Sequence, residues 1–540
     1  MTGRYYDVIV LGRSPGALLA AALLARRDFS VFVAGHTTKP ATYSYEGHAL
    51  RRRAFSLLGA PSPALRRALV ELAQSQTFRR RTVALDPMLT VLLPGRRFEI
   101  APDLALFERE MDREFPEVRR VLDELYTTLA RVNESTDLAF TRDLVWPPGS
   151  FWERQRASRA LAQLPFAREG GPDVLADLPP YHPYRAVVDA SVAFASDLAP
   201  SRRPLPPFAA ARLHGAWTRG VVAFAGGEDE LVQFLVDRIT AHGGIVALNE
   251  RVERVAAGRD GVQGVFLEGD TTRTGCQFLL TTETGEELAA LAGGAGVSGR
   301  AQRHWPRVTP TLGRFVLSLV VKREGVPDPL GAESIVFGQA PGSPPDPRRP
   351  TLRLQRTDRM SGPSVMGGAS GAAGASVATG ASPPEHVLLV AETILPLPPA
   401  RGGLPATEAR EAVLGTLRMH LPWLEQHLVA CDSPHDGRAL WFYAQGERRE
   451  IDRIHVRGAS LRAEPMEPLY DVDPPSFFGL GGEPLRGPIG RTFLVGKSVL
   501  PALGQEGELL ASVSAARLVT KSDPRRERLR LEMWNRVEIG

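Results

Sequence analysis

The first forty residues constrain the fold more than any other part of the chain. Val8–Leu11 is a short apolar run that ends at Gly12, a pattern typical of a strand buried on both faces. A helix of small and apolar residues, with no polar face in its first turns, is expected over Gly16–Arg27, and Val31–Ala34 is a second apolar strand. The order of strand, glycine turn, helix and strand predicts a βαβ unit that opens a doubly wound, Rossmann-like α/β domain.

The turn before this helix carries part of a phosphate-binding pattern. The N-terminus of a helix offers unpaired backbone N–H groups and a partial positive charge, which suit a diphosphate. Measured against G-x-G-x-x-G, Gly12 holds the first position, Ser14 replaces the second glycine, and Ala17 is a permitted variant of the third. Gly16 adds a further small residue at the helix start, and Gly35 stands where an acidic residue should bind a ribose hydroxyl. The pattern indicates a dinucleotide site that lacks two of its expected contacts.

Two other interpretations of this segment stay open. A βαβ unit that binds nothing would have the same pattern of apolar residues. Ala17–Ala25 also resembles the apolar part of a secretory signal. A strand and a glycine turn come before that helix and no convincing cleavage site follows it, which favours the βαβ unit.

Length and composition limit the class of protein. A chain of 540 residues is too long for one simple core, so two or three intertwined domains are expected. No apolar run approaches the ~20 residues that cross a bilayer. Two cysteines, Cys276 and Cys431, exclude a disulfide framework and a cysteine-only metal site, and they favour a reducing cytoplasm. The eleven histidines show no metal-ligand spacing, so no metal site is expected.

The net charge of +4 comes from short arginine clusters such as Arg51-Arg52-Arg53. Each cluster is most often a solvated face, and a weak preference for anionic membrane surfaces or acidic partners is the alternative. Nucleic acid is not an expected partner, because the basic stretches lack interleaved aromatic residues.

Later segments alternate between helical and sheet-like patterns. Asp103 is a candidate N-cap for a helical region over 103–215 that would cap a pocket. Arg314–Lys322 alternates in side-chain character and, with later strand-like runs, predicts a second, largely antiparallel sheet. Gly, Ala, Ser and Pro dominate 361–384, which is typical of a disordered surface insertion. Near the end, a strand over Arg491–Gly496, a glycine-bearing loop and a small-residue helix form a second candidate helix N-terminus directed at a ligand.

The order of these blocks resembles the phytoene desaturase and carotenoid isomerase branch of the FAD-dependent amine-oxidase-like superfamily. Four stretches carry the resemblance: Asp7–Arg27, Ala225-Gly226-Gly227 with the helix after it and Gly243-Gly244-Ile245, Val252–Leu267, and Phe493–Ser512. Each motif is weak alone, but together they span both ends of the chain and the length fits the whole family.

The resemblance implies an FAD-binding domain built from 1–102, 216–295 and 461–521. A helical substrate or cap region over 103–215 and a substrate-domain sheet over 296–460 would interrupt it, and 522–540 would be a charged tail. The diphosphate of FAD would lie against Gly12, Ser14, Gly16 and Ala17, the adenine near Val252, and the isoalloxazine under the loop with Gly496, Gly504 and Gly507.

The implied function is that of an FAD-dependent oxidoreductase. Hydride would pass between a long apolar substrate, a polyene or another lipid-like molecule, and the flavin, in the cytoplasm or at the surface of a membrane. The resemblance names no catalytic residue. Ser14 and Gly35 depart from the family pattern, and Ala502 and Leu503 stand where the family has glycines. A second hypothesis therefore stays open: a non-catalytic relative that has lost FAD and serves as a binding or scaffold protein.

Three further side chains are candidates for function. Glu506 lies at the start of the last small-residue helix, where capping is the simpler interpretation. His36 and His48 lie in loops near the opening turn and are expected to be solvated more often than functional.

Overall fold

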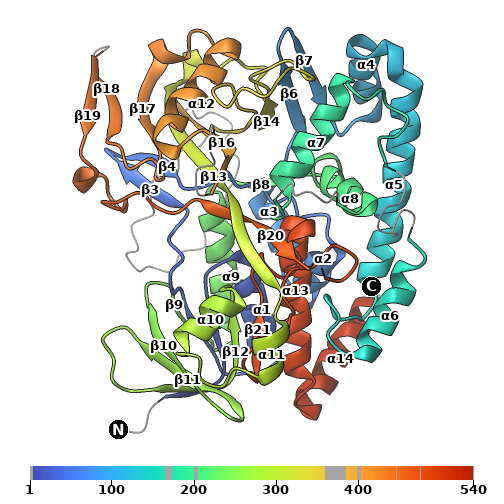
Figure 1. Ribbon diagram of the computed structural model, residues 1–540, viewed down its shortest axis with the longest axis vertical. Coiled ribbons are helices and arrows are strands. Elements are labelled where there is room, and N and C mark those ends of the chain that lie inside the picture. Colours follow the sequence, from blue (N-terminus) through green and yellow to red (C-terminus); the bar gives the residue numbers. More distant parts are fainter. Residues whose placement is uncertain are drawn as a thin grey trace.

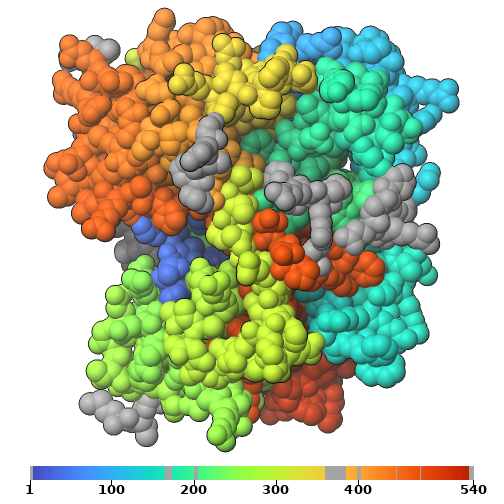
Figure 2. Space-filling model, viewed as in Figure 1, coloured from blue at the N-terminus to red at the C-terminus, as the bar shows by residue number. Residues whose placement is uncertain are grey.

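The computed structural model of the chain describes residues 4–164, 173–199, 205–358, 385–397, 403–444, 447–474 and 476–538. These residues form two lobes, each built around its own sheet and placed one above the other in Figure 1. A strip of the early, blue-coloured chain is visible between the lobes in Figure 2.

The first sheet follows the doubly wound pattern that the opening residues predict. Its order is β10-β11-β12-β1-β2-β9, with β21 beside β12. Pairing is parallel from β9 through β2, β1 and β12 to β21, whereas β10 and β11 are antiparallel. The strands are β1 (Tyr5–Leu11), β2 (Val31–Ala34), β9 (Ile245–Ala247), β10 (Val252–Gly258), β11 (Gly261–Leu267), β12 (Thr274–Thr281) and β21 (Thr492–Leu494).

Helix α1 (Pro15–Arg26) is the centre of this lobe. Ten of its residues are buried, from Gly16 to Ala25, because it packs against α9 (Glu228–Ala241) on one side and α13 (Gly504–Thr520) on the other. A helix covered from several directions needs small, apolar residues all round, which explains its missing polar face. The predicted α/β, doubly wound fold built from discontinuous segments is therefore confirmed.

The second lobe contains a ten-stranded sheet in the order β19-β18-β17-β13-β16-β15-β14-β6-β7, with β20 beside β13. All its pairs are antiparallel except β14 with β6, so the predicted antiparallel character holds. The strands are β6 (Leu89–Leu93), β7 (Arg96–Ile100), β13 (Arg307–Lys322), β14 (Glu333–Val336), β15 (Leu352–Thr357), β16 (His386–Pro396), β17 (Leu428–Asp432), β18 (Leu440–Ala444), β19 (Glu447–Ile451) and β20 (Glu467–Asp473).

Both faces of β13 are buried from Gly313 to Val321, although its sequence alternates in the way that a half-exposed strand does. Helix α12 (Ala406–His420) packs against the strand, and β4 (His48–Arg51), paired with β3 (Thr42–Tyr45), also contacts it.

The helical region consists of α4 (Leu104–Glu114), α5 (Arg119–Thr141), α6 (Phe151–Leu161), α7 (Pro183–Ala195) and α8 (Pro207–Thr218). Asp103 caps α4, as predicted, by accepting a hydrogen bond from the Leu106 N–H at 2.9 Å. Smaller elements are α2 (Pro63–Glu71), α3 (Ser75–Arg81), β5 (Thr82–Ala84), β8 (Val222–Phe224), α10 (Gly285–Leu291), α11 (Gly299–His304) and α14 (Pro524–Glu538).

The predicted domain boundaries stay predictions. Two features cross these boundaries. Strands β6 and β7 belong to the second sheet, although they fall within 1–102, which was predicted as FAD-binding domain. Strand β20 pairs with β13 of the second sheet, although it falls within 461–521, the predicted closing part of that domain. The insertion predicted over 361–384 lies outside the described residues. Across the parts that the structure describes, every helix is too short or too polar to cross a membrane.

Candidate ligand cleft

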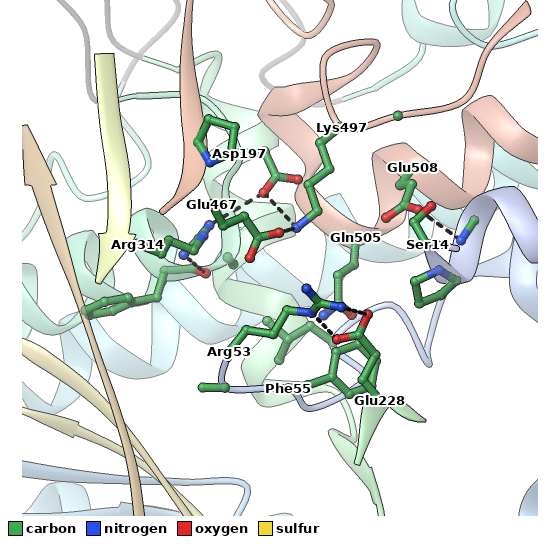
Figure 3. Close-up of a pocket in the computed structure, with 18 of the residues that line it drawn as sticks. Ser14, Arg53, Phe55, Asp197, Glu228, Arg314, Glu467, Lys497, Gln505 and Glu508 are labelled. Atoms are coloured by element: carbon green, nitrogen blue, oxygen red, sulfur yellow. Dashed lines mark hydrogen bonds and ion pairs between the residues drawn. The ribbon is translucent and has the colours of Figure 1, made fainter. Parts of the chain in front are cut away.

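A cavity of about 210 Å³ lies where the two lobes meet, beside the start of α1. Its walls come from both lobes and include three of the predicted site residues, Ser14, Gly16 and Gly496. Figure 3 shows that its interior is crowded with charged side chains that point toward one another. Gly12, Ala17, Val252, Gly504 and Gly507 are not among the residues that line it.

The N–H groups at the start of α1 are already bonded to side chains of the protein. The carboxylate of Glu508, on α13, accepts a hydrogen bond from the Gly16 N–H at 2.9 Å (Figure 3), and the Ser14 hydroxyl accepts one from the Ala17 N–H at 3.3 Å. Glu508 is 5% exposed. Its burial raises the pKa of the carboxyl, although the charge of Lys497 and the bond from Gly16 act the other way. Glu508 therefore occupies the position where a diphosphate was expected.

The predicted glycines allow chain segments to approach one another. Gly12 has φ +112°, and a Cβ there would lie 2.3 Å from the hydroxyl oxygen of Thr282. A Cβ on Gly496 would lie 2.3 Å from the Thr282 carbonyl oxygen. Gly504 and Gly507 also pack against carbonyl oxygens. A Cβ on Gly504 would lie 1.8 Å from the nearest one, and a Cβ on Gly507 would lie 2.2 Å from the nearest one. Close packing against backbone accounts for Gly496, Gly504 and Gly507, and the positive φ and the Thr282 side chain account for Gly12.

The end of β2, where the ribose and adenine of FAD were expected, is closed by backbone contacts. A Cβ on Gly35 would lie 1.9 Å from the Leu248 carbonyl oxygen, so a carboxylate has no room at this position. His36 follows at φ 55°, and its Nδ1 accepts a hydrogen bond from the Val252 N–H at 3.2 Å. Its side chain is buried rather than solvated, and burial lowers the pKa of the imidazole. The expectation of a solvated His36 was wrong.

A carboxylate that the sequence analysis missed lies near this edge. Glu283 follows β12; its Oε1 accepts a hydrogen bond from the Thr37 hydroxyl at 3.1 Å and lies 3.8 Å from Nε2 of His36. Burial, with the nearby charge of Glu287, raises the pKa of Glu283 to about 7. The run Thr281-Thr282-Glu283-Thr284, which begins at the last residue of a buried strand, was the signal that could have identified it.

Ion pairs fill the middle of the cleft. Lys497 lies between Asp197, at 3.8 Å, and Glu467, with which it is hydrogen-bonded (Figure 3). Burial alone would raise the pKa of Glu467, but the charge of Lys497, with those of neighbouring arginines, lowers it to about 2. Arg314 lies 3.0 Å from Glu392 and 3.6 Å from Asp197. None of these groups was identified from the sequence, because their partners come from distant segments.

The arginine cluster at 51–53 is not a solvated face, so that expectation was wrong. Arg52 pairs with Glu464 at 2.8 Å, and Arg53 binds Glu228 through both of its carboxylate oxygens (Figure 3). Arg51 lies 3.8 Å from Asp229. Each guanidinium holds the early chain to a distant acidic segment.

Glu506 does not cap its own helix. Its two carboxylate oxygens accept hydrogen bonds from Arg212 on α8, at 2.5 and 2.6 Å, and Arg212 also reaches Asp137 on α5 at 2.6 Å. The capping interpretation was therefore wrong, and Glu506 joins the last helix to the helical region.

These side chains, as placed, do not fit FAD. The buried carboxylate of Glu508 holds the N–H group that a diphosphate would need, and two anions at one helix N-terminus repel each other. The cavity of about 210 Å³ is smaller than the roughly 300–1,000 Å³ of ordinary ligand pockets. Charged pairs, among them Lys497 with Glu467 and Arg53 with Glu228, lie in it beside apolar residues. Within the described residues, no group of three or more potential ligands can hold a metal ion.

Comparison with solved structures identifies the fold. An oxidoreductase from Methanosarcina mazei is similar at a TM-score of 0.52 and 15% identity, covering 95% of this chain and 99% of the other. A putrescine oxidase variant from a redesign of cofactor binding is similar at a TM-score of 0.52 and 14% identity, covering 96% of this chain and all, 100%, of the other. At this identity the likeness shows the fold alone, which this chain shares with that oxidoreductase and with putrescine oxidase. The desaturase branch stays a hypothesis. No protein-family model and no curated protein matches the sequence.

Proposed function

We propose that the chain keeps the fold of flavin-dependent oxidoreductases without holding FAD, and that it binds a small, largely apolar molecule. The observation that carries this proposal is the buried carboxylate of Glu508 on the Gly16 N–H, which supplies from within the chain the anion that FAD would bring. Gly35 and the closed edge beside it support the proposal, because they remove the place of the ribose carboxylate.

The proposal has a physical basis in the balance of charges. A helix N-terminus is stabilised by one nearby anion. Because Glu508 is part of the chain, it supplies that anion without the loss of translational and rotational freedom that binding a ligand requires. For a diphosphate to take its place, a buried carboxylate would have to move into water or take up a proton, and the ion pairs of Lys497 and Arg53 would have to separate.

The visible absorbance spectrum of the purified chain tests this proposal. We expect a colourless protein that also carries no flavin after incubation with excess FAD and gel filtration. Putrescine oxidase taken through the same steps is the positive control. A yellow protein with one flavin per chain would contradict the proposal.

A second candidate function is an FAD-dependent oxidoreductase of the desaturase or isomerase type, acting on a polyene or another long apolar substrate. It is favoured by the fold and by the cavity, which runs from Ser14 to Gly496 and so connects the two predicted turns. The raised pKa of Glu508 also supports it, because an uncharged carboxyl leaves its site more easily. Bound FAD together with oxidation of such a lipid would establish this candidate. Cytoplasmic location and contact with a membrane surface stay predictions.

A further inference from the structure

A second and larger cavity, of about 610 Å³, lies beside the cleft and has the size of an ordinary ligand site. It lies between the β5–β8 pair, the start of α9 and the edge of the second sheet. Phe55, Arg53 and Glu228 line both cavities, so the Arg53–Glu228 ion pair forms part of the wall between them.

The walls of this larger cavity are mostly apolar. Phe55, Val83, Leu85, Phe224 and Leu330 all line it, and they come from four separate parts of the chain. Five acidic residues line the cavity: Asp86, Glu99, Glu228, Asp328 and Asp358. Asp328 and Asp358 are 89% and 47% exposed, and Asp86 is also exposed. Glu99 and Glu228 are paired with Arg97 and Arg53. An open, mostly apolar cavity of this size matches the hydrocarbon part of a ligand.

The floor of the cavity carries an uncompensated positive charge. Arg51 lines it, and its guanidinium lies against the backbone of Gly227, where a Cβ would lie 3.2 Å from three of its atoms. Arg51 and Arg13 share one carboxylate, that of Asp229, at 3.8 and 3.3 Å. The arginine side chains are only 9% and 7% exposed, whereas Asp229 is 29% exposed.

Neighbouring groups do not cancel this charge. Glu228 is already bound through both oxygens to Arg53, and Nε of Arg13 has no hydrogen-bond partner among the described residues. Burial lowers the pKa of Arg51 and of Arg13, with Asp229 acting the other way in each case. Two buried guanidiniums against one half-exposed carboxylate favour a further anion.

We propose that this cavity binds an amphiphilic carboxylate, with its head on Arg51 and its hydrocarbon tail along Phe55, Leu85 and Phe224. Asp229 then pairs with Arg13, which is already the nearer of its two arginines. The head forms charge-assisted hydrogen bonds with a guanidinium that has lost most of its water, and the tail buries apolar surface.

This inference rests on the proposed function in one respect, namely that the chain binds a small, largely apolar molecule. The two fail separately. Flavin absorbance decides whether FAD is held at α1, and binding of a carboxylate at Arg51 decides the present inference, because the ligand's head would contact Arg51 and neither Ser14 nor Gly16.

Calorimetric titration of the full-length chain with three probes of equal tail length tests the inference: dodecanoate, dodecanol and dodecylammonium, below their aggregation concentrations. We expect saturable one-to-one binding of dodecanoate, at least tenfold weaker binding of dodecanol, and the weakest binding of dodecylammonium. Equal affinity for the acid and the alcohol, or a preference for the ammonium ion, overturns the proposal. These results use the unmodified chain and do not depend on the folding of a variant.

Two variants locate the site. R51M removes the charge and keeps the length of the side chain, and we expect dodecanoate affinity to fall at least tenfold while dodecanol affinity changes less than threefold. R356M is the matched control, because Arg356 lines the same cavity but is paired with Asp358 at 2.7 and 2.9 Å. Its expected change is below threefold. Equal losses in both variants, or unchanged dodecanoate binding in folded R51M, overturn the assignment.

Discussion

Single residues decide whether this fold can hold its usual cofactor. Ser14 and Gly35 depart from the dinucleotide pattern in ways that the sequence shows directly. Glu508 is different, because its partner Gly16 lies 492 positions earlier in the chain. A contact of that kind depends on how α13 packs against α1, so local patterns do not reveal it.

Replacing Glu508 should show what its hydrogen bond contributes. Glu508→Ala leaves the buried Gly16 N–H without an acceptor, so we expect the free energy of unfolding to fall by about 1–3 kcal/mol. Glu508→Gln keeps an acceptor for that N–H, and we expect a smaller loss than in Glu508→Ala. Urea unfolding at neutral pH measures both variants. Equal destabilisation by Ala and Gln would show that the hydrogen bond to Gly16 is not the relevant contact.

Glu283 should make stability depend on pH. Its pKa, raised to about 7 by burial and Glu287, exceeds the ordinary glutamate value of 4.5. As pH rises through the window from about 4.5 to about 7, the unfolded chain releases this proton while the folded chain keeps it. The contribution of Glu283 to the free energy of unfolding therefore falls across this window.

Glu283→Gln removes that titration and provides the measurement. Relative to the unmodified chain, the variant should gain about 3 kcal/mol of unfolding free energy between pH 4 and pH 8, measured by urea unfolding. A difference that stays constant over this range would mean that Glu283 titrates normally.

At the scale of helices and strands, local sequence patterns were sufficient for most elements. The βαβ unit and the N-cap at Asp103 both lie where the residues predicted them. Patterns failed where a charged side chain had a distant partner. Arg51–Arg53 looked like a solvated face because a run of arginines does not show which carboxylates will approach it.

The Arg212 network joins three helices and should be important for stability. Arg212 is 4% exposed and holds Glu506 on α13 and Asp137 on α5. Arg212→Leu leaves the buried carboxylate of Glu506 without its ion pair, whereas Asp137 keeps Arg219, so we expect a loss of about 3–5 kcal/mol in the free energy of unfolding. Arg120→Leu is the control, because the Arg120–Glu124 pair is exposed and should contribute nothing measurable. A loss below 1 kcal/mol in Arg212→Leu would contradict the assigned role.

At the scale of the whole molecule, the sequence predicted two sheets and their discontinuous construction but not how the lobes close on each other. The cleft depends on side chains from both lobes, among them Arg53 from the first hundred residues and Lys497 from the last fifty. Whether such a cleft is filled or open depends on the packing of long charged side chains, which spacing along the chain does not encode. The four family-like blocks therefore identified the fold correctly without deciding the cofactor.

Calorimetric titration of FAD into the purified, unmodified chain measures directly whether the start of α1 accepts a diphosphate. With Glu508 seated on the Gly16 N–H, we expect no saturable heat of binding and no change in melting temperature as FAD is added. One-to-one binding, with a melting temperature that rises with FAD concentration, would show that the cleft opens for the cofactor and would contradict the proposed loss of FAD.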